Sequence, residues 1–242
     1  MAQRLPGAPS FFDLHCHTRA SFDSLAPPAA VVRVAAERGL THLAITDHDR
    51  IDGALEARDA APSGLHVIIG EEIRTTDGDL IAAFISEAIP PGLSPDEAIA
   101  AVREQGGLVG LPHPFDRFRG SLLRDVAMGR LATLVDWVEV HNARAIGNGN
   151  QLAAEFAHAN GLPGVAVSDA HSTMEVGVAY STVAGDLSTP EGLLAALAAC
   201  QVVPGRASYV VRALTPAAKL VNRLRGNRRL GVAAPKDRIA LP

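Results

Sequence analysis

The feature that most constrains the fold is a regular alternation of short apolar runs with longer amphipathic segments. Seven such runs are short and largely apolar, with many β-branched residues, and have the length of buried β-strands. Segments of helical period separate most of them, which favours parallel strands joined by right-handed crossovers. A series of seven such strands closes more readily into a barrel than it extends into an open sheet. We therefore expect an α/β fold with a seven-stranded (β/α)7 barrel, whose strands are residues 11–16, 42–46, 65–70, 80–85, 108–111, 137–140 and 164–167.

Proline, serine and glycine mark the ends of several predicted helices. Pro27-Pro28 precedes a helical segment that stops at Gly39, and Ser94-Pro95 supplies an N-cap and a first-turn proline for the next. Residues 121–133 and 148–160 have the same period. Near the end of the chain we expect a helix over 189–200, a short strand over 201–204 and a last helix over 216–225.

Length and composition favour one soluble domain. No linker is evident before about residue 186, so residues 1–215 are predicted to form the barrel and residues 216–242 a short C-terminal extension. No window approaches the roughly 20 apolar residues of a membrane span, and the first ten residues lack the apolar core of a signal peptide. Two cysteines in 242 residues make no disulfide scaffold. These features predict a cytoplasmic protein without a membrane partner.

The first predicted strand carries a pattern typical of a metal site. In the sequence Asp-Leu-His-Cys-His-Thr at 13–18, the strand period of two places Asp13, His15 and His17 on one face. Two imidazoles spaced in this way can bind one ion, and a nearby carboxylate can orient a ring. Cys16 points to the other face, so it is not predicted to act as a nucleophile. The pair alone is equally compatible with two exposed histidines at a strand end.

Similar residues follow most of the other strands. Any one of them could be a buried structural histidine or an N-cap. However, six of the seven strands end in His, Asp or Glu, and the carboxyl ends of parallel barrel strands meet at one rim. The sequence therefore predicts one shared metal site, with contributions from Thr46-Asp47-His48, Glu71-Glu72, Pro112-His113-Pro114, Glu139-Val140-His141 and Asp169-Ala170-His171.

The order of these motifs, DLHCHT, SFDS, AITDHD, GEEI, HPF, VEVHNAR and SDAH, closely resembles the polymerase-and-histidinol-phosphatase (PHP) phosphoesterases over residues 11–185. The resemblance implies a distorted seven-stranded barrel. Within the Glu71-Glu72 pair, the resemblance matches Glu72 to the family's bridging carboxylate and Glu71 to a position that varies among relatives. Residues 79–85 lack a histidine that relatives often carry near the fourth strand, and His141 is a secondary candidate to replace it. The ligands that the resemblance implies are His15, His17, Asp23, His48, Glu72, His113, Asp169 and His171.

The resemblance also implies chemistry. Imidazole and carboxylate ligands suit Zn²⁺, Mn²⁺ or Fe²⁺, and we expect two to three ions, a trinuclear site at most. A hydroxide bridging the ions would be the nucleophile, with Glu72 as bridging carboxylate and Asp169 helping to position it. Arg144, Asn142 and Arg119 are candidates for binding the substrate, and Arg117 is a weaker one. A surface role for Arg144 is about equally compatible with the sequence.

Three functions fit these residues. The first is a hydrolase of small phosphate monoesters, such as a nucleotide or sugar phosphate. The second is an exonuclease-type phosphodiesterase acting on DNA, RNA or oligonucleotides. The third is a non-catalytic, metal-stabilised module, against which the near-complete ligand set argues. Aromatic residues make up only 4% of the chain, so a base-stacking surface is not evident, which favours the small substrate.

The C-terminal segment is basic. Residues 212–238 contain eight basic side chains and one acidic one. A solvated tail is one interpretation and a contact surface for a polyanion is the other. The tail is expected to be peripheral and to contribute no ligand. Leu220, Val221 and Leu224 are expected to pack on the barrel exterior while the arginines stay in water.

Overall fold

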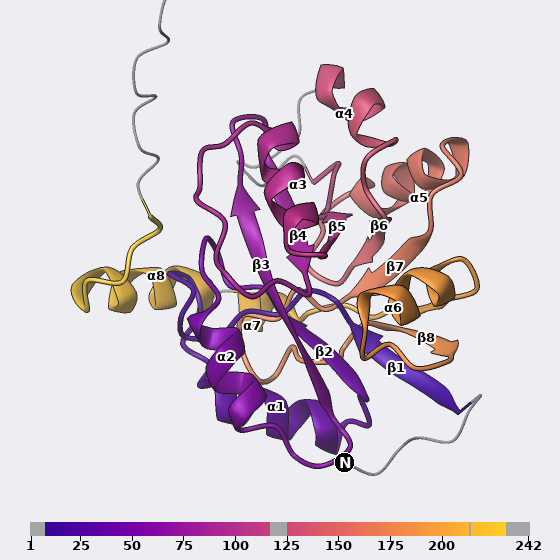
Figure 1. Ribbon diagram of the computed structural model, residues 1–242. Helices are drawn as coiled ribbons and strands as arrows, with labels where there is room; N and C mark the ends of the chain where they lie inside the picture. The colour runs from indigo at the N-terminus through magenta and orange to yellow at the C-terminus, as the bar shows by residue number, and fades with distance from the viewer. Residues whose placement is uncertain (1–7, 117–124, 213, 231–242) are drawn as a thin grey trace, which may run out of the picture.

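The computed structural model describes residues 8–116, 125–212 and 214–230, which form an α/β fold around one curved sheet (Figure 1). Arg117 and Arg119 lie outside the described residues. In the described part of the chain the sheet has nine strands in the order β7-β6-β5-β4-β3-β2-β1-β8-β9. Their bounds are β1 Pro9–Asp13, β2 His42–Ile45, β3 His66–Arg74, β4 Asp79–Ala83, β5 Leu108–Leu111, β6 Trp137–Asn142, β7 Gly164–Val167, β8 Tyr180–Ala184 and β9 Gln201–Val203.

The sheet curls into a nearly closed barrel. The seven predicted strands correspond to β1–β7, and the short strand predicted at 201–204 is β9. The prediction missed β8, so the described sheet contains nine strands and not seven. The two ends of the sheet approach each other. The amide of Ala166 in β7 donates to the Ser181 hydroxyl in β8 at 2.8 Å. At a second point the Cys200 thiol, just before β9, donates to the Gly164 carbonyl at 3.2 Å.

Not all strands are parallel, contrary to the expectation from the sequence. Strand β4 runs antiparallel to both β3 and β5. Only residues 75–78 separate β3 from β4, and a crossover to a parallel neighbour needs about a dozen residues or more. A hairpin is therefore the only connection available there. Strand β8 is likewise antiparallel to its neighbours β1 and β9.

Helices cover the outside of the curved sheet (Figure 1). Helix α3 begins with a complete capping box, in which Ser94 accepts from the Glu97 amide and Glu97 accepts from the Ser94 amide. The predicted helix at 121–133 is observed over 125–131, and the one at 148–160 over 149–159. The helices are α1 Pro28–Glu37, α2 Asp52–Asp59, α3 Pro95–Glu104, α4 Asp125–Leu131, α5 Gly149–Ala159, α6 Pro190–Leu197, α7 Tyr209–Arg212 and α8 Leu214–Leu224. No helix in the described ranges is long and apolar enough to cross a membrane.

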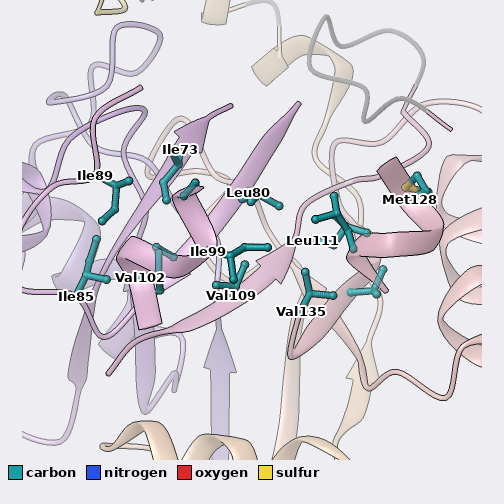
Figure 2. Close-up of a cluster of buried hydrophobic side chains, with 14 of the residues drawn as sticks. Ile73, Leu80, Ile85, Ile89, Ile99, Val102, Val109, Leu111, Met128 and Val135 are labelled. Carbon is teal, nitrogen blue, oxygen red and sulfur yellow. The ribbon is translucent and has the colours of Figure 1, made fainter. Parts of the chain in front are cut away.

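Apolar packing between the sheet and α3 and α4 fixes one side of the barrel. Figure 2 shows Ile99 and Val102 of α3 beside Val109 of β5, with Met128 of α4 near Leu111. All of them are buried. Burial of such side chains contributes roughly 1.5–3 kcal/mol each, so this layer holds β3, β4 and β5 in a fixed register beneath the rim where the predicted ligands lie.

A close contact inside the barrel gives a stability prediction. A Cβ atom at Gly110 would lie 2.2 Å from the ring of Trp137, which is fully buried. Gly110→Ala is expected to lower the free energy of unfolding by about 2 kcal/mol, because overpacking forces a large side chain to move. Urea denaturation would measure it. The matched control is Gly129→Ala in α4, where an added Cβ meets nothing within 4 Å. Equal stability of the Gly110 variant and wild type would contradict this packing.

Candidate metal centre

All eight predicted ligand residues lie together at one end of the barrel. Strand β1 leads into a bridge between Cys16 and Ala170, and a second bridge joins His48 to Glu72. These bridges continue the parallel pairing beyond the strand ends and bring the polar residues of four chain segments together. None of the eight is more than 9% exposed, the set being His15, His17, Asp23, His48, Glu72, His113, Asp169 and His171.

The centre of this arrangement is formed by His15, His17, Glu72 and Asp169. The Nε2 atoms of His15 and His17 lie 2.9 Å apart. Glu72 Oε2 is 3.4 Å from the Nε2 atom of each ring. Asp169 Oδ1 is 3.4 Å from His17 Nε2 and 3.6 Å from His15 Nε2. Lone pairs from four side chains therefore point at a common volume.

Three further residues lie beside this centre. His48 Nε2 is 3.4 Å from Asp23 Oδ2, and His171 Nε2 is 3.3 Å from the same oxygen. On its other side His171 Nδ1 faces the Asp169 backbone carbonyl at 2.9 Å. That contact favours the tautomer with hydrogen on Nδ1, which leaves the Nε2 lone pair directed at the Asp23 carboxylate.

Two of the clustered residues have strained backbones. His113 has φ of 26° and Asp169 has φ of 51°, and Asp49, next to His48, has φ of 57°. Such conformations cost non-glycine residues roughly 1–3 kcal/mol and occur preferentially at functional sites. His113 nevertheless lies in place, with its Nε2 atom 3.3 Å from Glu72 Oε1.

In the part of the chain that the structure describes, donor atoms within 4.8 Å of one another form three groups that could hold metal ions. We name each by one carboxylate. The Asp23 group is His17, Asp23, His48 and His171; the Asp169 group is His15, His17 and Asp169; the Asp79 group is His48, Glu72 and Asp79.

The state of the donor atoms fits metal binding. His17 Nδ1, His48 Nδ1 and Glu72 Oε2 are buried and make no hydrogen bond. His48 Nδ1 lies only 3.0 Å from Glu72 Oε2, so the two atoms are close without the geometry of a hydrogen bond. Buried polar atoms are usually satisfied, and two ligands of one ion approach each other in this way. Mixed imidazole and carboxylate donors suit Zn²⁺, Mn²⁺ and Fe²⁺.

Glu139 and Asn142 fix the orientation of ligand residues through hydrogen bonds. Glu139 Oε1 is 2.6 Å from His15 Nδ1, while its Oε2 accepts from the His113 amide at 3.0 Å. The Asn142 side-chain amide donates to Glu139 at 2.9 Å and to Asp169 at 3.0 Å. Burial alone would lower the pKa of His15, but the carboxylate of Glu139 and those of Asp169 and Glu72 outweigh it and hold that pKa well above its usual value.

The charge state of Glu72 follows from its neighbours. Burial alone would raise the pKa of this carboxyl, but His48 and His15 outweigh burial and keep the pKa well below its usual range. Glu71 behaves in the opposite way. It points to the other side of β3, where its Oε2 accepts from the Ile89 amide at 2.8 Å, and burial raises its pKa to about 8. The pKa values of the two adjacent acids are therefore shifted in opposite directions.

Other predicted residues lie away from the cluster. Cys16 is buried among the aliphatic side chains of α1 and β2, on the opposite face from His15 and His17 as expected. His141 Nε2 lies 2.7 Å from the Gly205 carbonyl and belongs to none of the three groups. Asp13 does not orient a histidine ring; it accepts from the backbone amides of His15 and Ser168.

Three functional candidates were missed from the sequence. Asp79 begins β4, the strand in which relatives often carry a histidine, and the acid at that position is the signal that could have indicated it. Glu139 was noted at a strand end but not as the partner of a ring. Arg229, in the C-terminal segment, contacts Asp49 and Asp79, and no local sequence pattern indicated it.

A cavity of about 780 Å³ opens over the cluster. Arg144 lines it and is fixed by Glu175 at 2.7 Å and by the Thr215 hydroxyl at 2.8 Å. Asn142 does not line it, because its amide is directed at Glu139 and Asp169. Among the described residues, the lining combines five members of the Asp23 and Asp79 groups with five basic side chains: Asp23, His48, Glu72, Asp79 and His171, with Arg74, Arg144, Arg212, Lys219 and Arg229.

The expected position of the C-terminal segment is wrong in one respect. Leu220 and Leu224 of α8 are 61% and 80% exposed, while Ala218 and Asn222 are buried. The helix therefore packs through a small and a polar residue, and Arg229 is only 23% exposed. The proposed division of the chain at residue 215 stays a prediction.

Family models and known proteins are similar in sequence to this chain. The PHP domain model matches residues 13–118, and a PHP-associated model matches residues 147–202. An uncharacterized protein of Methanocaldococcus jannaschii is 39% identical over 145 residues, which are 54% of this chain and 81% of that protein. A 5'-3' exoribonuclease of Haemophilus influenzae is 45% identical over 65 residues, 26% of this chain and 23% of that enzyme.

A solved structure is similar in fold. It is a two-domain protein from Bacteroides vulgatus that contains a predicted PHP-like metal-dependent phosphoesterase. The TM-score is 0.68 at 19% identity, over 82% of this chain and 65% of that one. The matched models include every residue of the three donor groups, since these lie within 13–118 and 147–202. The chain thus belongs to the PHP family.

Proposed function

We propose that the protein is a metal-dependent phosphoesterase that hydrolyses small phosphate monoesters. The observation that carries this proposal is the cavity, in which residues of the Asp23 and Asp79 groups and several basic side chains face the same space. Metal ions held there would polarise the phosphoryl oxygens and lower the pKa of a water molecule. Basic side chains beside them would attract an anionic substrate.

The residues around the donor groups are suited to a preorganised site. Glu139 would fix the ring plane of His15 through Nδ1, so that Nε2 faces the ions. Asn142 would keep the Asp169 carboxylate from rotating. Arg144 is held by Glu175 and Thr215, and its planar guanidinium suits a non-bridging phosphate oxygen. Such groups act without reorganisation during the reaction, which is a large part of electrostatic catalysis.

The size and lining of the cavity favour a small substrate. Its volume of about 780 Å³ is in the range of single-ligand pockets. Among the described residues that line it, Phe22 is the only aromatic one. A binding groove for a nucleic-acid strand usually stacks successive bases on several aromatic rings. The described lining of this cavity offers one such ring, so it provides little base stacking for a long strand.

A second candidate function is an exonuclease-type phosphodiesterase. It is favoured by the similarity to an exoribonuclease and by the exposed side chains of Arg223, Arg225 and Arg228, which follow the cavity lining along the tail. A strand whose end entered the cavity could place its backbone against these arginines. In that case cleavage of an oligonucleotide would depend strongly on salt.

Turnover of a panel of phosphoesters tests the proposal. The protein would be stripped with a chelator and restored with Mn²⁺, Zn²⁺ or Fe²⁺. We expect hydrolysis of p-nitrophenyl phosphate and of nucleotide or sugar monophosphates, and rates at least about a hundredfold lower on bis(p-nitrophenyl) phosphate and oligonucleotides. Preferential cleavage of oligonucleotides would favour the second candidate. No turnover of any ester by metal-loaded protein would favour a non-catalytic module.

A further inference from the structure

The C-terminal segment is fastened to the loop that carries Asp23. Asn222 is buried in α8, and its side-chain amide donates to the carbonyls of Ser21 at 3.2 Å and Ser24 at 2.8 Å. This loop lies between β1 and α1. An amide that satisfies two backbone carbonyls fixes both partners in orientation, so α8 is tied to the Asp23 side of the metal centre.

A second asparagine fixes the chain just before Arg229. The Asn227 side-chain amide donates to the Ala20 carbonyl at 3.1 Å and to that of Arg19 at 3.2 Å. The backbone amide of Asn227 donates to the Asn222 carbonyl at 2.9 Å, so the two asparagines are also hydrogen-bonded to each other. The chain beside Arg229 is therefore held in place, and Arg229 lines the cavity.

Arg229 ends in the metal centre. Its Nη2 atom is 2.9 Å from Asp79 Oδ1, and its Nε atom is 3.3 Å from Asp49 Oδ2. The two carboxylates are 2% and 0% exposed. A guanidinium shared between two buried carboxylates is a strong, charge-assisted contact. Asp79 and Glu72 are the two carboxylates of the Asp79 group, and neither belongs to another group, so this contact engages one of the two acids on which the group depends.

We propose that the Arg229 guanidinium takes the place of the third metal ion. The inference rests on the proposed metal centre. In the wild-type protein the Asp23 and Asp169 groups each bind an ion, and Arg229 supplies the positive charge at the Asp79 group. A divalent ion there would have to displace a buried guanidinium from Asp79 or lie beside it, and like charges at a few ångströms repel strongly in a partly buried site.

The arrangement also makes the tail part of the site. Arg229 is a positioning residue in this scheme: it neutralises Asp79 and Asp49 and lines the cavity near His48 and Glu72. Asp23, by contrast, forms its ion pairs with the rings of His48 and His171, which belong to the same group. The Asp79 group thus differs from the Asp23 group in its charged partner, and the tail decides whether the Asp79 group takes an ion.

Metal stoichiometry tests this inference. Wild type, Arg229→Gln, Arg229→Lys and Arg228→Gln would be stripped, loaded with excess Mn²⁺, desalted and subjected to elemental analysis. Arg228 is exposed and adjacent, so its variant is the matched control. We expect two ions in wild type, Arg229→Lys and Arg228→Gln, and three in Arg229→Gln. In a calorimetric titration the third ion should bind Arg229→Gln at least about tenfold more tightly than wild type.

Asp79→Asn provides a second test that leaves the tail unchanged. This variant is expected to keep two ions, because Asp79 holds none in wild type, and Arg229→Gln/Asp79→Asn should lose the third ion again. Three tightly bound ions in wild type, or loss of an ion in Asp79→Asn, would overturn the inference while the proposed function stands. Binding of no ion by any variant would overturn the metal centre and this inference with it.

Discussion

Glu72→Ala and Asp169→Ala are each expected to reduce phosphoester hydrolysis at least about a thousandfold at saturating Mn²⁺. Glu72 lies within 3.4 Å of nitrogen atoms from four histidines, which are His15, His17, His48 and His113. Asp169 faces His15, His17 and His171. Loss of either carboxylate would remove a charge that several ligands share, so both ion binding and placement would suffer.

Two neighbouring substitutions serve as controls for this result. Glu71→Ala and Cys16→Ser are expected to keep most of the activity, because Glu71 faces Ile89 and Cys16 faces the aliphatic side chains of α1. Steady-state kinetics on the best ester of the panel would measure all four variants, with circular dichroism to check folding. An inactive Glu71→Ala beside an active Glu72→Ala would mean that the assigned roles of the two faces of β3 are reversed.

The positions of several donor residues could be predicted from the sequence because they depend on local structure, whereas Asp23 was indicated only by the family resemblance. His15 and His17 share a face through the strand period, and His48 and Asp169 follow directly after apolar strands. Parallel strands then bring such ends together whatever the details of the loops. For the same reason the opposite orientation of Glu71 was predictable from Glu72 by alternation alone.

Asp79, β8 and Arg229 could not be found in this way. Asp79 reaches the centre only because β4 turns back along β3 as a hairpin, and the prediction assumed crossovers throughout. Strand β8 completes the sheet by pairing with β1, about 170 residues earlier, and such pairing leaves no local periodic signal. Arg229 depends on where the tail docks, which is decided by hydrogen bonds to backbone carbonyls of another loop.

The orientation of α8 was wrong for a related reason. The apolar residues of its sequence suggest that Leu220 and Leu224 face the barrel. In the structure Asn222 takes the buried position instead, since its amide is fully used by the carbonyls of Ser21 and Ser24. The hydrophobic periodicity of a sequence predicts a helix, but it does not predict that a polar residue such as Asn222 will be buried in place of apolar ones. The apolar character of Leu220 and Leu224 therefore did not predict which face of α8 packs on the barrel.

Removal of the ions is expected to lower the melting temperature by roughly 10 °C or more. An ion present at a thousand times its dissociation constant stabilises the folded state by about 4 kcal/mol, and for a domain of this size each kcal/mol corresponds to about 2–4 °C. Without ions the carboxylates of Asp23, Glu72, Asp79 and Asp169 remain buried together, where like charges repel. Differential scanning calorimetry with a chelator, followed by addition of Mn²⁺, would measure the loss and its recovery.

The Glu72→Ala variant separates metal loss from general effects of the chelator. It should melt close to the apo wild type and respond little to chelation, because the carboxylate nearest to four histidines is missing. Glu71→Ala should still lose about as many degrees on chelation as wild type, since its side chain contacts Ile89 and not the donor groups. A melting temperature of wild type that is unchanged by complete metal removal would contradict the idea that ions hold this buried cluster together.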